Sequence, residues 1–287
     1  RILRALRFAS VYGFSIEENT SKSIFKNADL LKNIATERVI SEFLKLICGK
    51  DAVKILDAYR ETIAVIIPEI TVMFNFNQNN IHHSYDLWQH TLTALGTIEP
   101  NPILRMTMLL HDIGKPSVKT TDNSGQSHFQ GHQLESKKIA DRILHRLRLP
   151  SDFINKTLLL IEYHDVRFNG SKKLMKKVMN VLGTDLTKQL LEVEYADISA
   201  QSEYQREEKL GYLETAKTHL NEIIKDNECF KLSQLDINGK DVLNLGVKEG
   251  RDVGNILDYL LMLVVDANVP NKKSILISKA KEYIYGN

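Results

Sequence analysis

The stretch LLHDIGK, residues 109–115, constrains this chain most, because it sets His111 beside Asp112 at the end of an apolar run. Neutral imidazole and ionised carboxylate are both good ligands for borderline divalent cations. A carboxylate among apolar side chains would otherwise carry an uncompensated desolvation cost. His-Asp pairs also occur by chance, and His164-Asp165 is a second one here. The rest of the sequence must therefore decide whether the pair binds a metal.

The composition is that of an ordinary globular chain, with 287 residues, 43% hydrophobic and 26% charged. This length predicts two or three helical sub-domains. A formal net charge of only +2 means that any contact with nucleic acid must come from local basic patches. The two cysteines, Cys48 and Cys229, have no CxxC spacing, which fits a reducing cytosol and argues against a thiolate metal site. The apolar run 260–265 is too short to cross a bilayer and no signal peptide is recognisable, so we expect a cytoplasmic protein without membrane contact.

Amphipathic patterns predict helices from the first residue onward. The pattern over residues 1–13 ends at Gly13, and its arginines either form a solvated face or contact phosphates and bases. The chain begins with Arg1 inside that pattern, so we expect a fragment whose N-terminal part is missing. A second helix is expected after an N-cap at Thr36, and a third from Asp51 to Ile67.

Further histidines and one aspartate fall in phase with apolar helix faces. His90 shares the stripe of a helix predicted over residues 84–97, and His132 follows a polar stretch, 117–131, that is expected to be a long loop over a site. His164 ends the helix after Pro150, and Asp197 lies on a later apolar stripe with no lysine or arginine one turn away. A lone histidine on such a face is more often a hydrogen-bonded core residue than a ligand. These four residues, together with His111-Asp112, come from five separate segments, and their shared placement on apolar faces favours a common site.

These residues offer nitrogen and oxygen ligands without sulfur, which suits one or two divalent ions such as Mg, Mn, Ni, Co or Fe, with Asp112 placed to bridge two of them. The predicted metal ligands are His90, His111, Asp112, His132, His164 and Asp197.

The order of these residues, with Gly114-Lys115 soon after the pair His111-Asp112, resembles the HD superfamily of metal-dependent phosphohydrolases. The resemblance implies an all-α fold and hydrolysis of a phosphate ester. It also implies catalytic roles for His111 and Asp112, with Lys115 near the substrate phosphate.

The N-terminal text RILRALRFA, with Gly13-Phe14 and ERVISEFLKL at residues 37–46, resembles the neck of bacterial tRNA nucleotidyltransferases and poly(A) polymerases. The stretch GKDVL at 239–243 and the glycines that follow it resemble the tail of that family. The resemblance implies that Arg1 completes a Glu-Asp-x-x-Arg element that reads the base of CTP or ATP, with Arg4 beside it as a second nucleotide-binding residue. Addition of CCA or of poly(A) would be the parent activity.

The family's polymerising head carries a Gly-Ser followed by an Asp-x-Asp pair that binds two Mg ions, and these 287 residues contain no such pair. We therefore expect no polymerisation by this chain alone. The expected division is a neck with RNA-binding helices at 1–72, an HD-like phosphohydrolase domain at 73–205, and a helical, tRNA-binding tail at 206–287.

Lys172, Lys173, Lys176 and Lys177 form two like-charge pairs at i, i+4. Such pairs repel unless a polyanion lies against them, which suggests contact with RNA, although a solvated lysine face fits the spacing equally well.

Two functions remain open. One is an HD enzyme that acts on phosphate esters of RNA 3′ ends or nucleotides, within a nucleotidyltransferase or standing alone. The other is a non-catalytic body that binds tRNA. Metal-dependent release of phosphate would support the first, and salt-sensitive binding of tRNA without hydrolysis would support the second.

Overall fold

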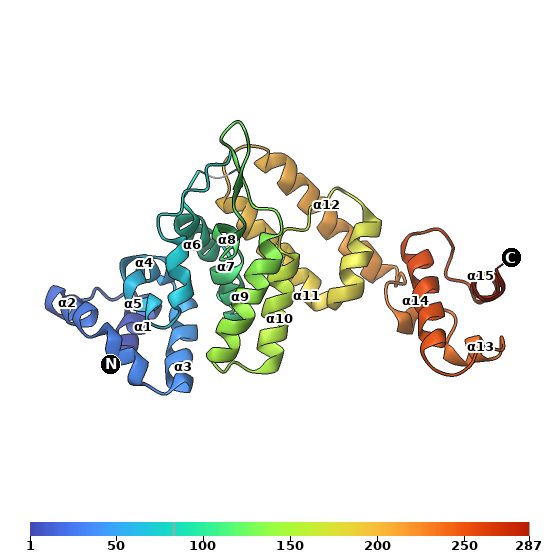
Figure 1. Ribbon diagram of the computed structural model, residues 1–287, viewed down its shortest axis with the longest axis horizontal. Helices are drawn as coiled ribbons and strands as arrows, with labels where there is room; N and C mark the ends of the chain where they lie inside the picture. The colour runs from blue at the N-terminus through green and yellow to red at the C-terminus, as the bar shows by residue number, and fades with distance from the viewer. Residues whose placement is uncertain (83, 287) are drawn as a thin grey trace. The chain divides into compact units, whose positions relative to one another are not determined.

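The computed structural model describes residues 1–82 and 84–286 and is built almost entirely of helices, as the all-α prediction requires (Figure 1). The chain forms two compact units, and each contains two separate segments. Unit 1 comprises Arg1–Arg167 and Lys188–Leu210, and unit 2 comprises Phe168–Thr187 and Gly211–Asn287. In the part of the chain that is described, no helix has both the length and the apolarity of a membrane span.

The first third of unit 1 is a set of short helices packed around α1, which contacts α3 and α4. Gly13 ends α1 in the left-handed conformation, with φ 75°. Thr36 is the first residue of α3 rather than its N-cap, and the single helix expected over residues 51–67 is broken at Tyr59. The elements are α1 (Ile2–Tyr12), α2 (Glu18–Lys26), η1 (Ala28–Asn33), α3 (Thr36–Ile47), α4 (Ala52–Ala58), α5 (Arg60–Ala64) and η2 (Pro68–Met73).

The middle of unit 1 packs α7 against α6 and α10, and α10 against α9. The polar stretch 117–131 is not a plain loop, because it contains an antiparallel hairpin with Thr120 opposite His128. The elements are α6 (Leu87–Thr97), α7 (Pro102–Leu110), α8 (Lys115–Val118), β1 (Thr120–Thr121), β2 (Ser127–His128), α9 (His132–Arg146) and α10 (Ser151–Tyr163).

Two long helices have residues in both units: α11 (Lys172–Ala200) and α12 (Arg206–Lys225). Gly183 interrupts α11 with φ 70° and ψ 176°, a backbone conformation that strongly favours glycine. The part of α11 after this break carries Asp197 into unit 1.

Unit 2 has a core of its own around Val242, Leu260 and Leu276, which are fully buried. Apolar positions at helical spacing along α14 supply about half of the buried residues of this core. The last elements are η3 (Leu232–Gln234), α13 (Gly239–Leu243), α14 (Arg251–Val265) and α15 (Lys273–Tyr285).

Candidate metal centre

All six predicted ligands lie together, and all belong to unit 1. They form two groups that share Asp112, and within each group the ligand atoms lie within 4.8 Å of one another. The first group consists of His90, His111, Asp112 and Asp197, and the second of Asp112, His132 and His164.

Asp112 divides its two oxygens between the groups. Its Oδ2 lies 3.3 Å from His90 Nε2 and 3.2 Å from His111 Nε2. Its Oδ1 lies 3.3 Å from His132 Nε2 and 3.6 Å from His164 Nε2. The carboxylate is thus placed to bridge two neighbouring cations, in keeping with the expectation from the sequence.

Each of the four histidines points Nδ1 at a backbone carbonyl. The acceptors are Ala200 for His90 at 3.2 Å, Met108 for His111 at 2.7 Å, Phe129 for His132 at 2.9 Å and Ile161 for His164 at 2.7 Å. Because a carbonyl can only accept, each ring carries its proton on Nδ1 and turns Nε2 toward the carboxylates. A hydrogen bond from the second ring nitrogen is the usual orienting contact of a metal-bound histidine.

The donor set fits a cation. His111 Nε2 and Asp112 Oδ1 are buried without a hydrogen-bond partner, which is costly for groups of this kind. His111 Nε2 also lies 3.4 Å from Asp197 Oδ1, so a nitrogen lone pair faces two carboxylates. A divalent ion or a proton between these atoms removes the repulsion.

Protons are held tightly here when no ion is present. Burial opposes the charged form of His111, but the carboxylates of Asp112 and Asp197 raise its pKa to about 10. Burial likewise opposes ionisation of Asp112, yet the charges of His111 and Lys115 hold its pKa well below the usual range. Metal binding at this centre must therefore release protons.

Lys115 lies inside the centre rather than open to solvent. Its side chain is 6% exposed, its Nζ lies 2.6 Å from Asp112 Oδ2, and it donates to Gln78 Oε1 at 3.0 Å. The ammonium therefore neutralises a predicted ligand, and its predicted contact with a substrate phosphate stays a prediction.

Three polar residues around the predicted ligands were not predicted from the sequence. Gln201 donates from Nε2 to Asp197 Oδ2 at 2.7 Å, and its i, i+4 spacing from that aspartate could have revealed it. Gln78 belongs to a loop, where no periodicity applies. Glu194 Oε1 is buried without a partner, and burial together with the charges of Asp197 and Asp165 raises the pKa of Glu194 well above its usual value.

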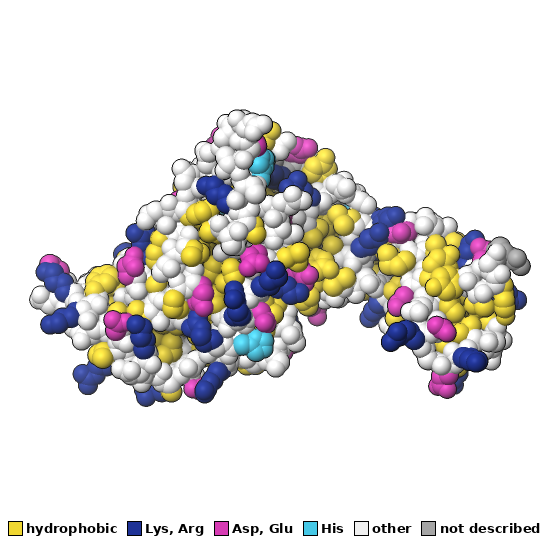
Figure 2. Space-filling view, in the orientation of Figure 1, with side chains coloured by type: hydrophobic (Ala, Val, Ile, Leu, Met, Phe, Trp, Pro, Cys, Tyr) yellow, Lys and Arg dark blue, Asp and Glu magenta, His cyan; other side chains and the backbone are white. Residues whose placement is uncertain are grey.

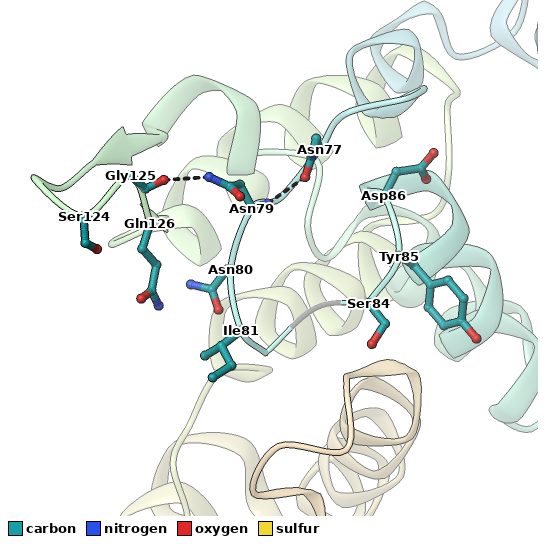
Figure 3. A pocket seen from close by; sticks show the side chains of 10 residues that line it. All are labelled: Asn77, Asn79, Asn80, Ile81, Ser84, Tyr85, Asp86, Ser124, Gly125 and Gln126. Atoms are coloured by element: carbon teal, nitrogen blue, oxygen red, sulfur yellow. Dashed lines mark hydrogen bonds between the residues drawn. The ribbon is translucent and has the colours of Figure 1, made fainter.

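A polar pocket of about 660 Å³ lies between the loop before α6 and the tip of the hairpin (Figure 3). Asn79 donates from Nδ2 to the Gly125 carbonyl at 2.6 Å across it. Among the described residues that line it, the charged one is Asp86, which caps α6 by accepting from Gln89 N. Gln78 is buried in the same loop and reaches Lys115, so the loop that lines the pocket also supports the metal centre.

The predicted nucleotide-binding arginines are exposed at the start of the chain. Arg1 precedes α1, and the Arg4 guanidinium lies 5.2 Å from the centre of the Phe8 ring. Their predicted contact with a nucleotide stays a prediction.

The four lysines at the start of α11 are paired with acidic residues of unit 2. Lys172 and Lys176 lie 2.5 and 2.6 Å from oxygens of Glu228, and Lys173 and Lys177 lie 3.1 and 3.0 Å from Asp266 Oδ1. These carboxylates offset the mutual repulsion of the lysines without a polyanion, contrary to the expectation from the spacing. Contact of these lysines with RNA stays a prediction. Figure 2 likewise shows basic and acidic side chains interspersed over the face in view.

Two family profiles match the chain. One, described as "Probable RNA and SrmB- binding site of polymerase A", matches residues 13–74. The other, described as "tRNA nucleotidyltransferase domain 2 putative", matches residues 132–280, which is more than half of the chain.

Similar proteins include the CC-adding tRNA nucleotidyltransferase of Thermus thermophilus, 29% identical over 290 residues that cover 95% of this chain and 64% of that protein. The A-adding tRNA nucleotidyltransferase of Deinococcus radiodurans is 29% identical over 58% of this chain and 41% of its own length. The Multifunctional CCA protein of Neisseria gonorrhoeae is 31% identical over 63% of this chain and 46% of its own length. The chain thus spans less than two thirds of each of these relatives.

The fold is also similar to that of the CCA-adding enzyme of Bacillus stearothermophilus, solved in complex with CTP. The TM-score is 0.58 and the identity 18%, with 100% of this chain and 62% of that one covered. Because the profile matches residues 132–280 and the relatives are similar in sequence, this chain belongs to the tRNA nucleotidyltransferase family.

Proposed function

We propose that this chain carries a divalent-metal centre of the HD type, which hydrolyses phosphate esters of RNA ends or nucleotides within a tRNA nucleotidyltransferase. One observation carries the proposal: four histidines donate Nδ1 to backbone carbonyls and turn Nε2 toward the carboxylates of Asp112 and Asp197. Such an arrangement is favourable only around a cation or protons.

The protein's own groups hold and tune this centre. Two ligand groups that meet at Asp112 suit one or two ions such as Mg, Mn, Ni, Co or Fe. When bound, such an ion polarises a phosphate ester and activates water at neutral pH. Lys115 offsets the charge of Asp112, and Gln201 fixes the carboxylate of Asp197. Backbone carbonyls fix the tautomers of the rings, so little reorganisation is needed when an ion binds.

Two hydrolyses test the proposal: release of phosphate from a 3′-phosphorylated RNA, and opening of a nucleoside 2′,3′-cyclic phosphate to the nucleoside monophosphate. We expect at least one of them with at least one of the candidate metals, and neither in EDTA. Asp112→Asn should lower the rate more than about 100-fold, because it removes the shared ligand and with it several kcal/mol of charge stabilisation. Asp141→Asn, in an exposed ion pair with His145 on α9, is the matched control and should retain full activity. A metal-loaded chain that hydrolyses neither substrate would contradict the proposal.

The second function is tRNA binding by the helical body. The profile described as an RNA-binding site over residues 13–74 favours it, as do relatives named for their action on tRNA. Arg1 and Arg4 are the groups proposed to meet CTP or ATP.

Filter binding of labelled tRNA at increasing salt measures this function. We expect the affinity to fall steeply with salt and to survive Asp112→Asn, because phosphate contacts are independent of the metal centre. Equal loss of RNA binding and hydrolysis in a folded Asp112→Asn variant would contradict the separation of the two functions.

A further inference from the structure

Lys209, near the start of α12, lies next to the metal centre without being a ligand. Its Nζ donates to Gln201 Oε1 at 2.6 Å, and Gln201 Nε2 in turn donates to Asp197 Oδ2 at 2.7 Å. One amide therefore joins the ammonium to a predicted metal ligand. All three residues belong to unit 1, so this arrangement lies within one compact body.

The groups closest to this ammonium are neutral. Besides Gln201 Oε1, the Lys209 Nζ lies 3.5 Å from His82 Nδ1. Within residues 1–82 and 84–286, Lys209 forms no ion pair with a carboxylate. A half-buried ammonium without an anionic partner carries a desolvation cost that an anion would offset.

The charge of a second cation, Arg167, also acts on this imidazole. Burial lowers the pKa of His82, and the charges of Lys209 and Arg167 lower it further. His82 is therefore neutral, and with Nδ1 turned toward the Lys209 ammonium its Nε2–H is a further donor. The His82 carbonyl accepts from Ser202 N at 2.9 Å, which fastens this loop to the end of α11.

Other candidates for an anion site are less suitable. Lys115 is already engaged with Asp112 and Gln78 inside the centre. The pocket in Figure 3 is lined mainly by amides and hydroxyls, with the carboxylate of Asp86, and none of the described residues that line it is a cation. Lys209, which Gln201 joins to Asp197, is thus the best-placed cation, and Arg167 adds positive charge near His82 and Lys209.

We infer that Lys209 and Arg167, with the neutral imidazole of His82, bind the phosphate group of the substrate ester beside Asp197. This inference rests on the proposed function, because it assigns the substrate phosphate of the same centre. Ammonium and guanidinium groups form charge-assisted hydrogen bonds to phosphate oxygens, and the planar guanidinium can form two at once. A lysine held one hydrogen-bonded amide away from a ligand is set back far enough to leave the ligand free for an ion.

Calorimetric titration of inorganic phosphate into the metal-loaded 287-residue chain, dialysed free of excess metal, tests this. Lys209→Met and Arg167→Met should each weaken phosphate binding about 10-fold, which corresponds to about 1.4 kcal/mol, because each removes a charge-assisted hydrogen bond to the phosphate. Both variants should retain the metal content of the unchanged chain. Lys209→Arg, which keeps the charge, should bind phosphate with an affinity within about 3-fold of that of the unchanged chain. Lys188→Met removes an exposed lysine of α11 in the same unit and is the matched control.

The inference is overturned if Lys209→Met binds phosphate as tightly as the unchanged chain. It is also overturned if that variant loses metal, because Lys209 would then act only through Gln201 and Asp197. Kinetics separate this inference from the proposed function. If the unchanged chain hydrolyses esters and Lys209→Met does not raise KM, only the phosphate site is refuted. If phosphate binding depends on Lys209 but the chain hydrolyses no ester, only the proposed function is refuted.

Discussion

The Nε2 atoms of His132 and His164 lie 3.2 Å apart, although both rings donate Nδ1 to backbone carbonyls. Two acceptor nitrogens cannot form a hydrogen bond with each other. A cation between these nitrogens and Asp112 would remove the repulsion between their lone pairs. We therefore expect the stability of unit 1 to depend on metal.

We expect a divalent ion to raise the melting temperature of the chain. At a concentration of 100 Kd, an ion that binds only the folded state adds about 2.7 kcal/mol to the free energy of unfolding. His132→Gln should greatly reduce the metal-dependent rise, because it removes one ligand. His145→Gln, an exposed histidine on the same helix, should retain it. Differential scanning calorimetry with EDTA and with each candidate metal measures the effect, and an equal rise in both variants would exclude His132 as a ligand.

The metal-free chain should lose stability as pH rises. The pKa of His111 is about 10 in the folded state, against about 6.5 for an unfolded histidine. Between these values the folded state holds one more proton at this site, so the free energy of unfolding falls by about 1.4 kcal/mol per pH unit. The stabilisation is complete below pH 6.5 and absent above about 10.

Urea unfolding in EDTA from pH 6 to 10 checks this slope. His111→Gln should flatten it, and bound metal should also flatten it, because an ion takes the place of the proton. If stability in EDTA rises with pH, the prediction that His111 holds a proton in the folded state is wrong.

The meeting of the six predicted ligands could be anticipated from the sequence because the contacts that orient most of the rings are local. His111, His132 and His164 each donate Nδ1 to the carbonyl three residues earlier, so a helix end or turn alone fixes each ring. Long-range partners left no such signal. The lysines at 172–177 pair with carboxylates about 50 to 90 residues further along the chain. The hairpin tip that lines the pocket likewise lies in a stretch whose polar composition indicates only a loop.

Gly114 should be intolerant of a side chain. A Cβ at this position would lie 2.5 Å from Ser136 N and 2.8 Å from the His132 carbonyl, both backbone atoms of α9. The close approach sets the turn after Asp112 against the helix that carries His132. Gly114→Ala should therefore destabilise the chain by about 1–3 kcal/mol, the usual range for overpacking, and weaken metal binding.

Gly211→Ala is the matched control, because a Cβ there meets no atom within 4 Å. Its site in α12 is helical, so alanine should stabilise the chain by about 0.4–1 kcal/mol. Chemical denaturation of both variants gives the two free energies. Equal stability of the two would show that the contact between the turn and α9 contributes nothing.

Glu228 neutralises two lysines of α11, Lys172 and Lys176, that are predicted to contact RNA. Its carboxylate oxygens lie 2.5 Å from Lys172 Nζ and 2.6 Å from Lys176 Nζ, and Glu222 Oε2 lies 3.0 Å from Lys172. Glu228→Gln should cost up to about 1 kcal/mol in stability, because partly exposed ion pairs contribute little and the two lysines then repel. If these lysines contact tRNA, the same change should strengthen binding and steepen its dependence on salt, since it unmasks positive charge. Glu214→Gln, which removes an exposed ion pair to Lys217, controls for the loss of one negative charge. Filter binding at several salt concentrations measures both variants, and identical affinities and slopes would exclude Lys172 and Lys176 from the RNA interface.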